Sequence, residues 1–411
     1  TMQQLSNGSM KSQVWDSRNC YDFVILDEVH AFVGDAAFNP YTQSVLNFLV
    51  TKIGAQAIRI YISATPDIVI ENLAVVEQRI GAGRNRDVDY SLDGRKAYVN
   101  FFRFEKDYSY IQPVFFSDEA SLIKMLNNIE DKTLIFVKTK KQGQRLLESL
   151  GEKRATFIDA QSKANEEKES FGKILDEHTF DKNFLIVTKF LDVGVDLKDI
   201  KIKNVIIFQH FKEEVIQMVG RKRIKDNETV KVFFHIPTSC QVNQELNGLR
   251  ELYDEMKRNI NLFQGLVCFS ELPYPLYVRR EGDKLEVRYN HLAFTLLEHH
   301  IRCLEQYMWA YDNEQEFQEN FCKCILEWFP RHKPERFMEC QKGETADELE
   351  QLMAPLSGKE LDREELGKLC DEILKIANIK RRKDQESNVA MNKVKEIFRV
   401  HSVGYRIQNL S

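Results

Sequence analysis

A chain of 411 residues is too long to fold around a single hydrophobic core, and its length predicts two or three domains. Hydrophobic residues make up 43% of the chain and charged residues 29%, which is the composition of an ordinary globular protein. The net charge of −5 gives no overall attraction to nucleic acid or anionic lipid, so such binding would need a local basic surface.

The eight cysteines are scattered along the chain, and only Cys322 and Cys324 are close neighbours. This pattern predicts reduced thiols in the cytoplasm rather than a disulfide framework. No apolar run approaches the ~18 residues of a membrane span. The first residues also lack the layout of a signal peptide. We therefore expect no membrane association.

Apolar runs typical of buried strands alternate with helical stretches through the first 237 residues. Strands are expected within 23–28, 57–66, 132–139, 154–159, 183–190 and 203–210, and helices within 39–54, 140–153 and 166–178. The first strand reads as buried on both faces, and Asn39 reads as a helix cap. Strands that alternate with helices predict a parallel sheet whose ligands lie at the carboxyl ends of its strands.

Two acids and a histidine end the first strand, in the sequence Asp27-Glu28-Val29-His30. An aspartate in this place can hold Mg²⁺ through water beside a nucleotide, and the adjacent glutamate can orient or deprotonate the attacking water. Taken alone, the pair is explained more simply as capping acids at a junction between strand and loop.

Further short motifs follow in a fixed order. They are Ser63-Ala64-Thr65-Pro66, then Thr139, then a stretch with Thr188, Gly194 and Asp196, and finally Gln217, Gly220, Arg221 and Arg223. In this order and spacing they resemble motifs II to VI of the superfamily 2 helicases, in the branch with an Asp-Glu-x-His box. The stretch from 27 to 42 also resembles a bacterial group of DEAD/DEAH-box helicase-like proteins.

The resemblance implies an α/β fold with tandem RecA-like parallel-sheet domains, the first incomplete, followed by a mainly helical C-terminal domain. Residues 1–85 would be the C-terminal half of domain 1, with motifs II and III, and 86–115 a connector. Residues 116–237 would be domain 2, with motifs IV, V and VI, and 238–411 an accessory domain. ATP would bind between the two RecA-like lobes.

The resemblance also implies cofactors and roles. ATP and Mg²⁺ would be the cofactors, with Asp27 on the metal and Glu28 as general base. His30 would pass the state of the nucleotide to Ser63 and Thr65. ATP contacts would come from Gln217, Gly220, Gly194 and Asp196.

Motif VI departs from the family pattern Gln-x-x-Gly-Arg-x-x-Arg, because Arg223 comes one residue early and Ile224 stands at the last position. Either Arg221 or Arg223 would therefore be the arginine that stabilises charge on the γ-phosphate. Thr1, Thr139 and Thr188 would contact a nucleic-acid backbone, either DNA or RNA and expected to be single-stranded.

A phosphate-binding loop of the form Gly-x-x-x-x-Gly-Lys-Ser/Thr is not found in the sequence. The Gly-Lys pairs at 172–173, 358–359 and 367–368 are not followed by Ser or Thr. The opening residues "TMQQL" resemble the segment that precedes motif II in such proteins. We therefore expect the chain to begin midway through the first RecA-like domain and to be inactive by itself.

The predicted function is an ATP-dependent helicase or translocase of superfamily 2 that moves on DNA or RNA. One alternative is a non-hydrolysing remnant that binds nucleic acid or a partner. Another is the motor subunit of a restriction machine or of a phage or plasmid replication machine, which would imply partner subunits.

Three other features favour simpler explanations. Cys322 and Cys324, with nearby histidines, fit no common zinc spacing. The basic run at 380–383 is more typical of a solvated helix surface than of a nucleic-acid contact. Tyrosines within 271–290 predict a small β-hairpin that packs its aromatic rings.

Overall fold

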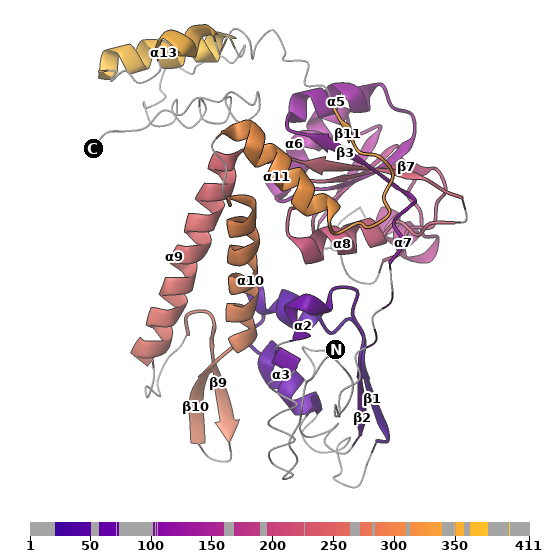
Figure 1. Ribbon diagram of the computed structural model, residues 1–411, viewed down its shortest axis with the longest axis vertical. Helices are drawn as coiled ribbons and strands as arrows, with labels where there is room; N and C mark the ends of the chain where they lie inside the picture. Colours follow the sequence, from indigo (N-terminus) through magenta and orange to yellow (C-terminus); the bar gives the residue numbers. More distant parts are fainter. Residues whose placement is uncertain are drawn as a thin grey trace. The chain divides into compact units, whose positions relative to one another are not determined.

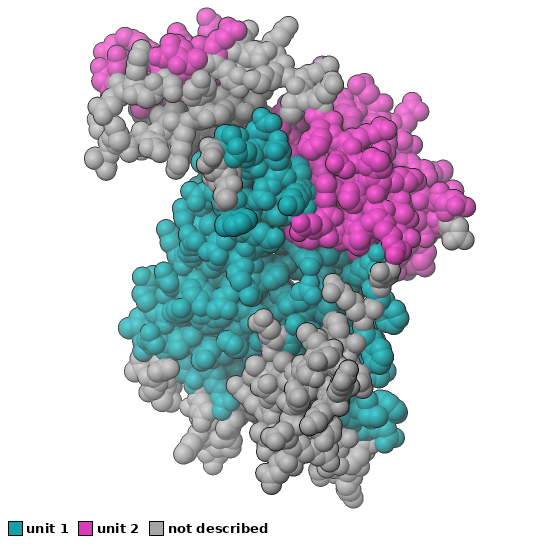
Figure 2. Space-filling view, in the orientation of Figure 1, with its two compact units in different colours: residues 1–106, 211–217, 238–324 teal, residues 107–210, 218–237, 325–411 magenta. Residues whose placement is uncertain are grey.

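The computed structural model describes residues 21–50, 57–70, 72–73, 102, 104, 106–159, 168–189, 195–225, 227–263, 272–281, 284–309, 313–338, 349, 351–356, 362–376 and 394. The chain divides into two compact units that do not follow its order (Figure 2). Unit 1 contains residues 1–106, 211–217 and 238–324. Unit 2 contains residues 107–210, 218–237 and 325–411.

Unit 2 is built on a seven-stranded sheet in which every pair of neighbours is parallel (Figure 1). In spatial order the strands are β11 (Arg336–Phe337), β3 (Ile111–Phe116), β8 (Val230–His235), β7 (Ile202–Ile207), β4 (Lys132–Phe136), β6 (Phe184–Val187) and β5 (Ala155–Ile158). This parallel sheet, with helices between its strands, is the α/β arrangement that the sequence predicted.

The central strands are buried because their side chains are apolar on both faces. All four residues of β6 are buried, and so are the last four of β4 and of β7. Parallel sheets with helices on their faces require such continuous apolar runs. The expected strands at 132–139, 154–159, 183–190 and 203–210 are thus confirmed, each slightly shorter than its apolar run.

Helices α5 (Glu119–Asn127), α6 (Lys140–Leu150) and α7 (Lys168–Asp176) link strands of this sheet. Asp118 caps α5 by accepting hydrogen bonds from the amides of Ala120 and Ser121, and Thr139 caps α6 by accepting from the amide of Gln142. Leu122, Leu126, Leu146 and Leu150 pack against the sheet in one hydrophobic cluster. The helices expected within 140–153 and 166–178 are therefore confirmed.

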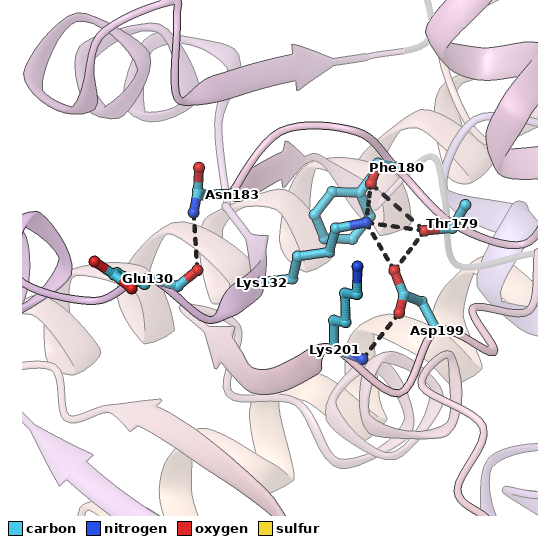
Figure 3. Close-up of polar contacts among 7 residues, drawn as sticks. All are labelled: Glu130, Lys132, Thr179, Phe180, Asn183, Asp199 and Lys201. Atoms are coloured by element: carbon cyan, nitrogen blue, oxygen red, sulfur yellow. Dashed lines mark hydrogen bonds and ion pairs between the residues drawn. The ribbon is translucent and has the colours of Figure 1, made fainter.

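A polar network lies at the amino ends of the central strands, opposite the edge where parallel sheets bind ligands (Figure 3). Lys132, the first residue of β4, donates to Asp199 Oδ2 at 2.7 Å and to Thr179 Oγ1 at 3.1 Å. Thr179 Oγ1 in turn donates to Asp199 Oδ2 at 2.6 Å, and the amide of Lys201 donates to Asp199 Oδ1 at 2.9 Å. We call Lys132, Thr179 and Asp199 the base network.

In unit 1, the N-terminal segment forms a parallel pair of strands, β1 (Phe23–Leu26) and β2 (Ile58–Tyr61). The short helices α2 (Ala31–Gly34), η1 (Asp35–Ala37) and α3 (Thr42–Phe48) follow β1, and η3 (Pro66–Ile68) follows β2. Their buried apolar residues, among them Val29, Val33 and Leu46, form one hydrophobic cluster.

Two expectations for this segment are wrong. The first strand is not buried on both faces, since Phe23 is 58% exposed and Ile25 is 60% exposed. The reason is that β1 pairs only with β2 among the described residues, and one face of this pair stays uncovered. Asn39 does not cap the helix directly. Helix α3 begins at Thr42 with Tyr41 as its N-cap, and the Asn39 side chain accepts from the amide of Tyr41 instead.

The remainder of unit 1 is mainly helical. It contains α9 (Ser239–Phe263), α10 (His291–Tyr307) and most of α11 (Glu314–Leu326). The predicted hairpin is confirmed as the antiparallel strands β9 (Leu276–Glu281) and β10 (Lys284–Tyr289). Tyr277 is buried edge-on against Tyr41, whereas Tyr289 is 44% exposed.

Helix α10 contacts α9, α2, α3, η1 and η3 within unit 1. Its N-cap is Asn290, whose side chain accepts from the amide of Leu292 and donates to Thr42 Oγ1 at 2.9 Å. Its apolar residues Leu292, Leu296 and Leu297 belong to the same hydrophobic cluster as Val29 and Val33. This helix therefore supports the segment that carries the acidic motif.

Residues near the C-terminus return to the sheet of unit 2. Strand β11 pairs with the edge strand β3, and Phe337 stacks on Phe115 with ring centroids 5.6 Å apart. The short helix η6 (Ala354–Leu356) and α13 (Arg363–Ile376) follow. In the described part of the chain, no helix has both the length and the apolarity to cross a membrane.

Candidate functional site

The acidic motif forms a tight turn directly after β1. Asp27 is exposed, and its Oδ1 accepts from the amide of Glu28 at 2.9 Å. Glu28 has a φ of +50°, in the left-handed region that residues other than glycine seldom adopt. Such strained backbone is concentrated at functional sites, where it directs a side chain. The turn places two carboxylates at the carboxyl end of a parallel strand.

His30 is the meeting point of three motifs within unit 1. Its Nδ1 lies 3.0 Å from Ser63 Oγ and 3.3 Å from Glu28 Oε2, and its Nε2 lies 3.2 Å from Gln217 Nε2. Gln217 is on α8 (Lys212–Gly220), whose first part belongs to unit 1. We call His30, Ser63 and Gln217 the His30 junction.

The hydrogen bonds of the junction select one form of the imidazole. The Gln217 amide nitrogen can only donate, so His30 Nε2 must be the acceptor and His30 Nδ1 must carry the proton. That proton points to Ser63 Oγ and Glu28 Oε2. Ser63 Oγ also accepts from the amide of Thr65 at 3.0 Å. A chain of hydrogen bonds therefore runs from Gln217 through His30 and Ser63 to Thr65.

Thr65 is only 6% exposed, and its hydroxyl oxygen has no hydrogen-bond partner among the described residues. Leaving a buried hydroxyl unpaired costs about 1–3 kcal/mol.

Motifs V and VI meet in unit 2. Arg223 Nε pairs with Asp196 Oδ1 at 2.9 Å, and the Arg223 side chain is 56% exposed. Arg221 is only 7% exposed, and its Nη1 donates to the carbonyl of Val195 at 3.4 Å. The amide of Leu197 donates to the carbonyl of Arg221, which joins the two motifs through their backbones.

The other predicted site residues lie on several elements. Thr139 is exposed and caps α6, Thr188 is half-buried at the end of β6, and Gly220 ends α8. Gly194 and Thr1 lie outside the described residues, as does the basic run at 380–383. Thr139 and Thr188 follow the neighbouring strands β4 and β6, and the proposed nucleic-acid contacts stay a prediction.

The described residues offer no group of three or more His, Cys, Asp or Glu side chains placed to hold a metal ion. Cys322 and Cys324 are buried, and burial raises the pKa of the Cys303 thiol to about 12. A Mg²⁺ ion bound largely through water needs only one or two carboxylates together with nucleotide phosphates. The exposed carboxylate of Asp27 fits that kind of site.

Sequence reasoning did not identify Glu213 as a site residue. It lies in the first turn of α8, where its two carboxylate oxygens accept from His299 Nε2 at 3.0 Å and from His300 Nε2 at 2.7 Å. The only sequence feature that could have indicated Glu213 is its place one helical turn before Gln217, and an acid at that spacing is a weak signal.

Comparison with known proteins finds a family model that matches part of the chain. Residues 118–225 match the helicase conserved C-terminal domain. This match agrees, over that part of the chain, with the resemblance to helicases that the motifs indicated. None of the curated proteins that were compared matches the chain.

Several solved structures are similar at low identity. Saccharomyces cerevisiae Dbp5 bound to RNA and ADP BeF3 is 16% identical over 57% of each chain, with a TM-score of 0.39. Mycobacterium smegmatis helicase Lhr bound to ssDNA and AMP-PNP is 17% identical over 52% of this chain and 28% of its own, with a TM-score of 0.34. A DEAD box protein from Methanococcus jannaschii is 18% identical over 62% of each chain, with a TM-score of 0.32. The chain thus spans 57% of the length of the Dbp5 structure and 62% of the length of the DEAD box protein.

Proposed function

We propose that this chain belongs to an ATP-dependent helicase or translocase, in which the His30 junction couples ATP hydrolysis to movement on single-stranded DNA or RNA. The observation that carries the proposal is the junction itself. Residues from three motifs, 33 and 187 positions apart in the sequence, converge on one imidazole. A structural role for the pair of acids would not require this convergence.

Each residue has a part that follows from its place. Asp27 would hold Mg²⁺, which supplies charge stabilisation for phosphoryl transfer when it is bound with ATP. Glu28 would take a proton from the attacking water. His30 would sense the Glu28 carboxylate through Nδ1 and pass its state to Ser63, since the same proton serves both oxygens.

Arg223 is better placed than Arg221 to stabilise charge on the transferred phosphoryl group. It is more than half exposed, and an exposed guanidinium can exchange its Asp196 partner for a phosphate. Arg221 is buried against the Val195 carbonyl, which fits a role in holding motif V in place.

A phosphate-binding loop of the form Gly-x-x-x-x-Gly-Lys-Ser/Thr is not found in these 411 residues. ATP hydrolysis should therefore be measured on the natural polypeptide that contains this sequence, with and without single-stranded DNA or RNA. Removing a general base lowers a rate about 10²–10⁴-fold. Glu28→Gln should thus abolish stimulated hydrolysis while ATP affinity changes by less than about twofold. Wild-type turnover in Glu28→Gln would refute the proposal.

A non-hydrolysing binding module is the second candidate, and the Gly-Lys pairs that lack Ser or Thr favour it. In that case the natural polypeptide would bind nucleic acid without hydrolysing ATP. The same assay distinguishes the two, because the binding module predicts equal background rates for wild type and Glu28→Gln.

A further inference from the structure

The first turn of α8 is tied to α10 by a buried carboxylate with two histidine partners. Glu213 is 8% exposed, and each of its oxygens accepts from a different imidazole, those of His299 and His300. Neighbouring residues of a helix seldom reach one small group. Here they do so because His300 also stacks on Phe211, with ring centroids 3.7 Å apart and planes 9° from parallel. We call Glu213, His299 and His300 the Glu213 clamp.

The clamp is a strong contact because its carboxylate is ionised in a buried place. Burial alone would raise the pKa of Glu213, but the hydrogen bonds from the two imidazoles outweigh it and hold the pKa well below its ordinary value. Removing either kind of partner would leave a buried charge or buried donors unpaired. The first turn of α8 is therefore fixed to α10 at this point.

Position along α8 connects the clamp to the His30 junction. Gln217 follows Glu213 by four residues, which places the two side chains on the same face of the helix. The amide of Val215 donates to the carbonyl of Phe211, so the turn between them is formed. Lys212 adds a more exposed ion pair with Asp67, 2.7 Å long, just after the Ser63–Thr65 turn.

Helix α10 also supports the other two members of the junction. It contacts α2, which follows His30, and η3, which follows Thr65. Asn72 donates to Thr295 Oγ1 of α10 at 3.1 Å. One helix of the C-terminal half of unit 1 thus contacts all three motif segments.

We propose that Glu213 is a positioning residue for motif VI: through His299 and His300 it fixes α8 to α10 and so keeps Gln217 on His30. This inference rests on the proposed function, because the junction is where it acts. The inference means that α10, within residues 238–324, influences the rate of hydrolysis through its contact with α8. In this proposal the Glu213 clamp acts on hydrolysis through Gln217.

The test is hydrogen exchange on the 411-residue chain, which needs no ATP hydrolysis. Two reporters matter: the amide of Val215, which donates to the carbonyl of Phe211 at the start of α8, and the amide of Thr65, which donates to Ser63 Oγ. Glu213→Gln should speed exchange at both by about tenfold or more, since a hydrogen bond to a charged group is lost. Arg250→Ala is the matched control. It removes the exposed ion pair between Arg250 on α9 and Glu305 on α10, and should change both exchange rates by less than about twofold.

Two further variants separate positioning from general loosening. In a Gln217→Ala background, Glu213→Gln should no longer affect Thr65, because no amide remains on His30. The double variant His299→Gln with His300→Gln keeps an N–H donor near the position of each Nε2, so exchange at both reporters should stay as slow as in wild type. The double leucine variant has no such donors, so exchange at both reporters should be faster. An equal Thr65 response with and without the Gln217 side chain would overturn the inference.

Hydrolysis by the natural polypeptide gives the second readout. Glu213→Gln should lower kcat about tenfold and change KM for ATP by less than about twofold. In this proposal Gln217 acts on His30 rather than as the ATP contact that the resemblance implied, and the other expected ATP contacts remain. An unchanged kcat would overturn the inference. A wild-type polypeptide without ATPase activity, in which Thr65 exchange still responds through Gln217, would instead refute the proposed function and support the clamp.

Discussion

The base network offers a stability prediction with a worked pH dependence. Burial raises the pKa of the Asp199 carboxyl, but hydrogen bonds from Lys132, Thr179 and the amide of Lys201 lower it from 3.8 to about 2. A pKa lowered in the folded state means that the ionised carboxylate stabilises the fold. This stabilisation is fully present above the unfolded value and is lost as the pH falls through the folded one.

The gap between 3.8 and about 2 corresponds to about 2.5 kcal/mol, and screening by solvent reduces this to about 1–2 kcal/mol. Asp199→Asn should therefore lower the free energy of unfolding of unit 2 by about 1–2 kcal/mol at pH 7. About half of that difference should be gone at pH 3, where the unfolded carboxyl is already protonated. The measurement is urea-dependent hydrogen exchange of β4 and β7, whose amides report on unit 2 alone.

Asp181→Asn is the control, because Asp181 forms a 2.7 Å ion pair with Lys173 but is 67% exposed. Such surface pairs contribute about 0–1 kcal/mol, so this variant should match wild type to within about 0.5 kcal/mol at every pH. If Asp199→Asn were as stable as wild type at pH 7, or if its deficit grew as the pH fell, the reasoning about the base network would be refuted.

Three more predictions concern the motifs and the core. Arg223→Ala should lower kcat of the natural polypeptide about 10³-fold in steady-state kinetics and leave its free energy of unfolding unchanged. Arg221→Ala should instead lower the free energy of unfolding of unit 2 by about 1–3 kcal/mol in urea. The opposite pattern would show that the catalytic and structural roles of the two arginines are reversed. Gln217→Ala should lower kcat about tenfold without changing KM, and a changed KM alone would contradict its place on His30. Gly143→Ala should destabilise unit 2 by about 1–3 kcal/mol, because the added Cβ would overlap the Phe157 ring, and a stabilised variant in thermal unfolding would contradict this.

The sheet of unit 2 was predictable because its strands carry their own signal. β4, β6 and β7 are short apolar runs separated by helices with recognisable caps such as Thr139. The edge strand β11 was not predictable, since it is only two residues long and packs Phe337 against a strand more than two hundred residues earlier. Sequence patterns report local periodicity and do not report such distant pairing.

The candidate site was also predictable only in part. The order of the motifs identified His30, Ser63 and Gln217, but not that they meet on one imidazole. The partners His299 and His300 of Glu213 lie 86 and 87 positions away, so no spacing rule could have found them. The exposed face of β1 also escaped prediction, because an apolar run does not show which neighbouring strands are present.

The most direct test of the account is the response of ATP hydrolysis to single-stranded nucleic acid in His30→Ala, measured on the natural polypeptide. The mutation keeps Asp27 and Glu28 but removes the group that joins them to Ser63 and Gln217. We predict that unstimulated hydrolysis stays within about threefold of wild type, while the stimulation by nucleic acid falls to near unity. Stimulation equal to that of wild type would contradict the account, because coupling would then not pass through the His30 junction.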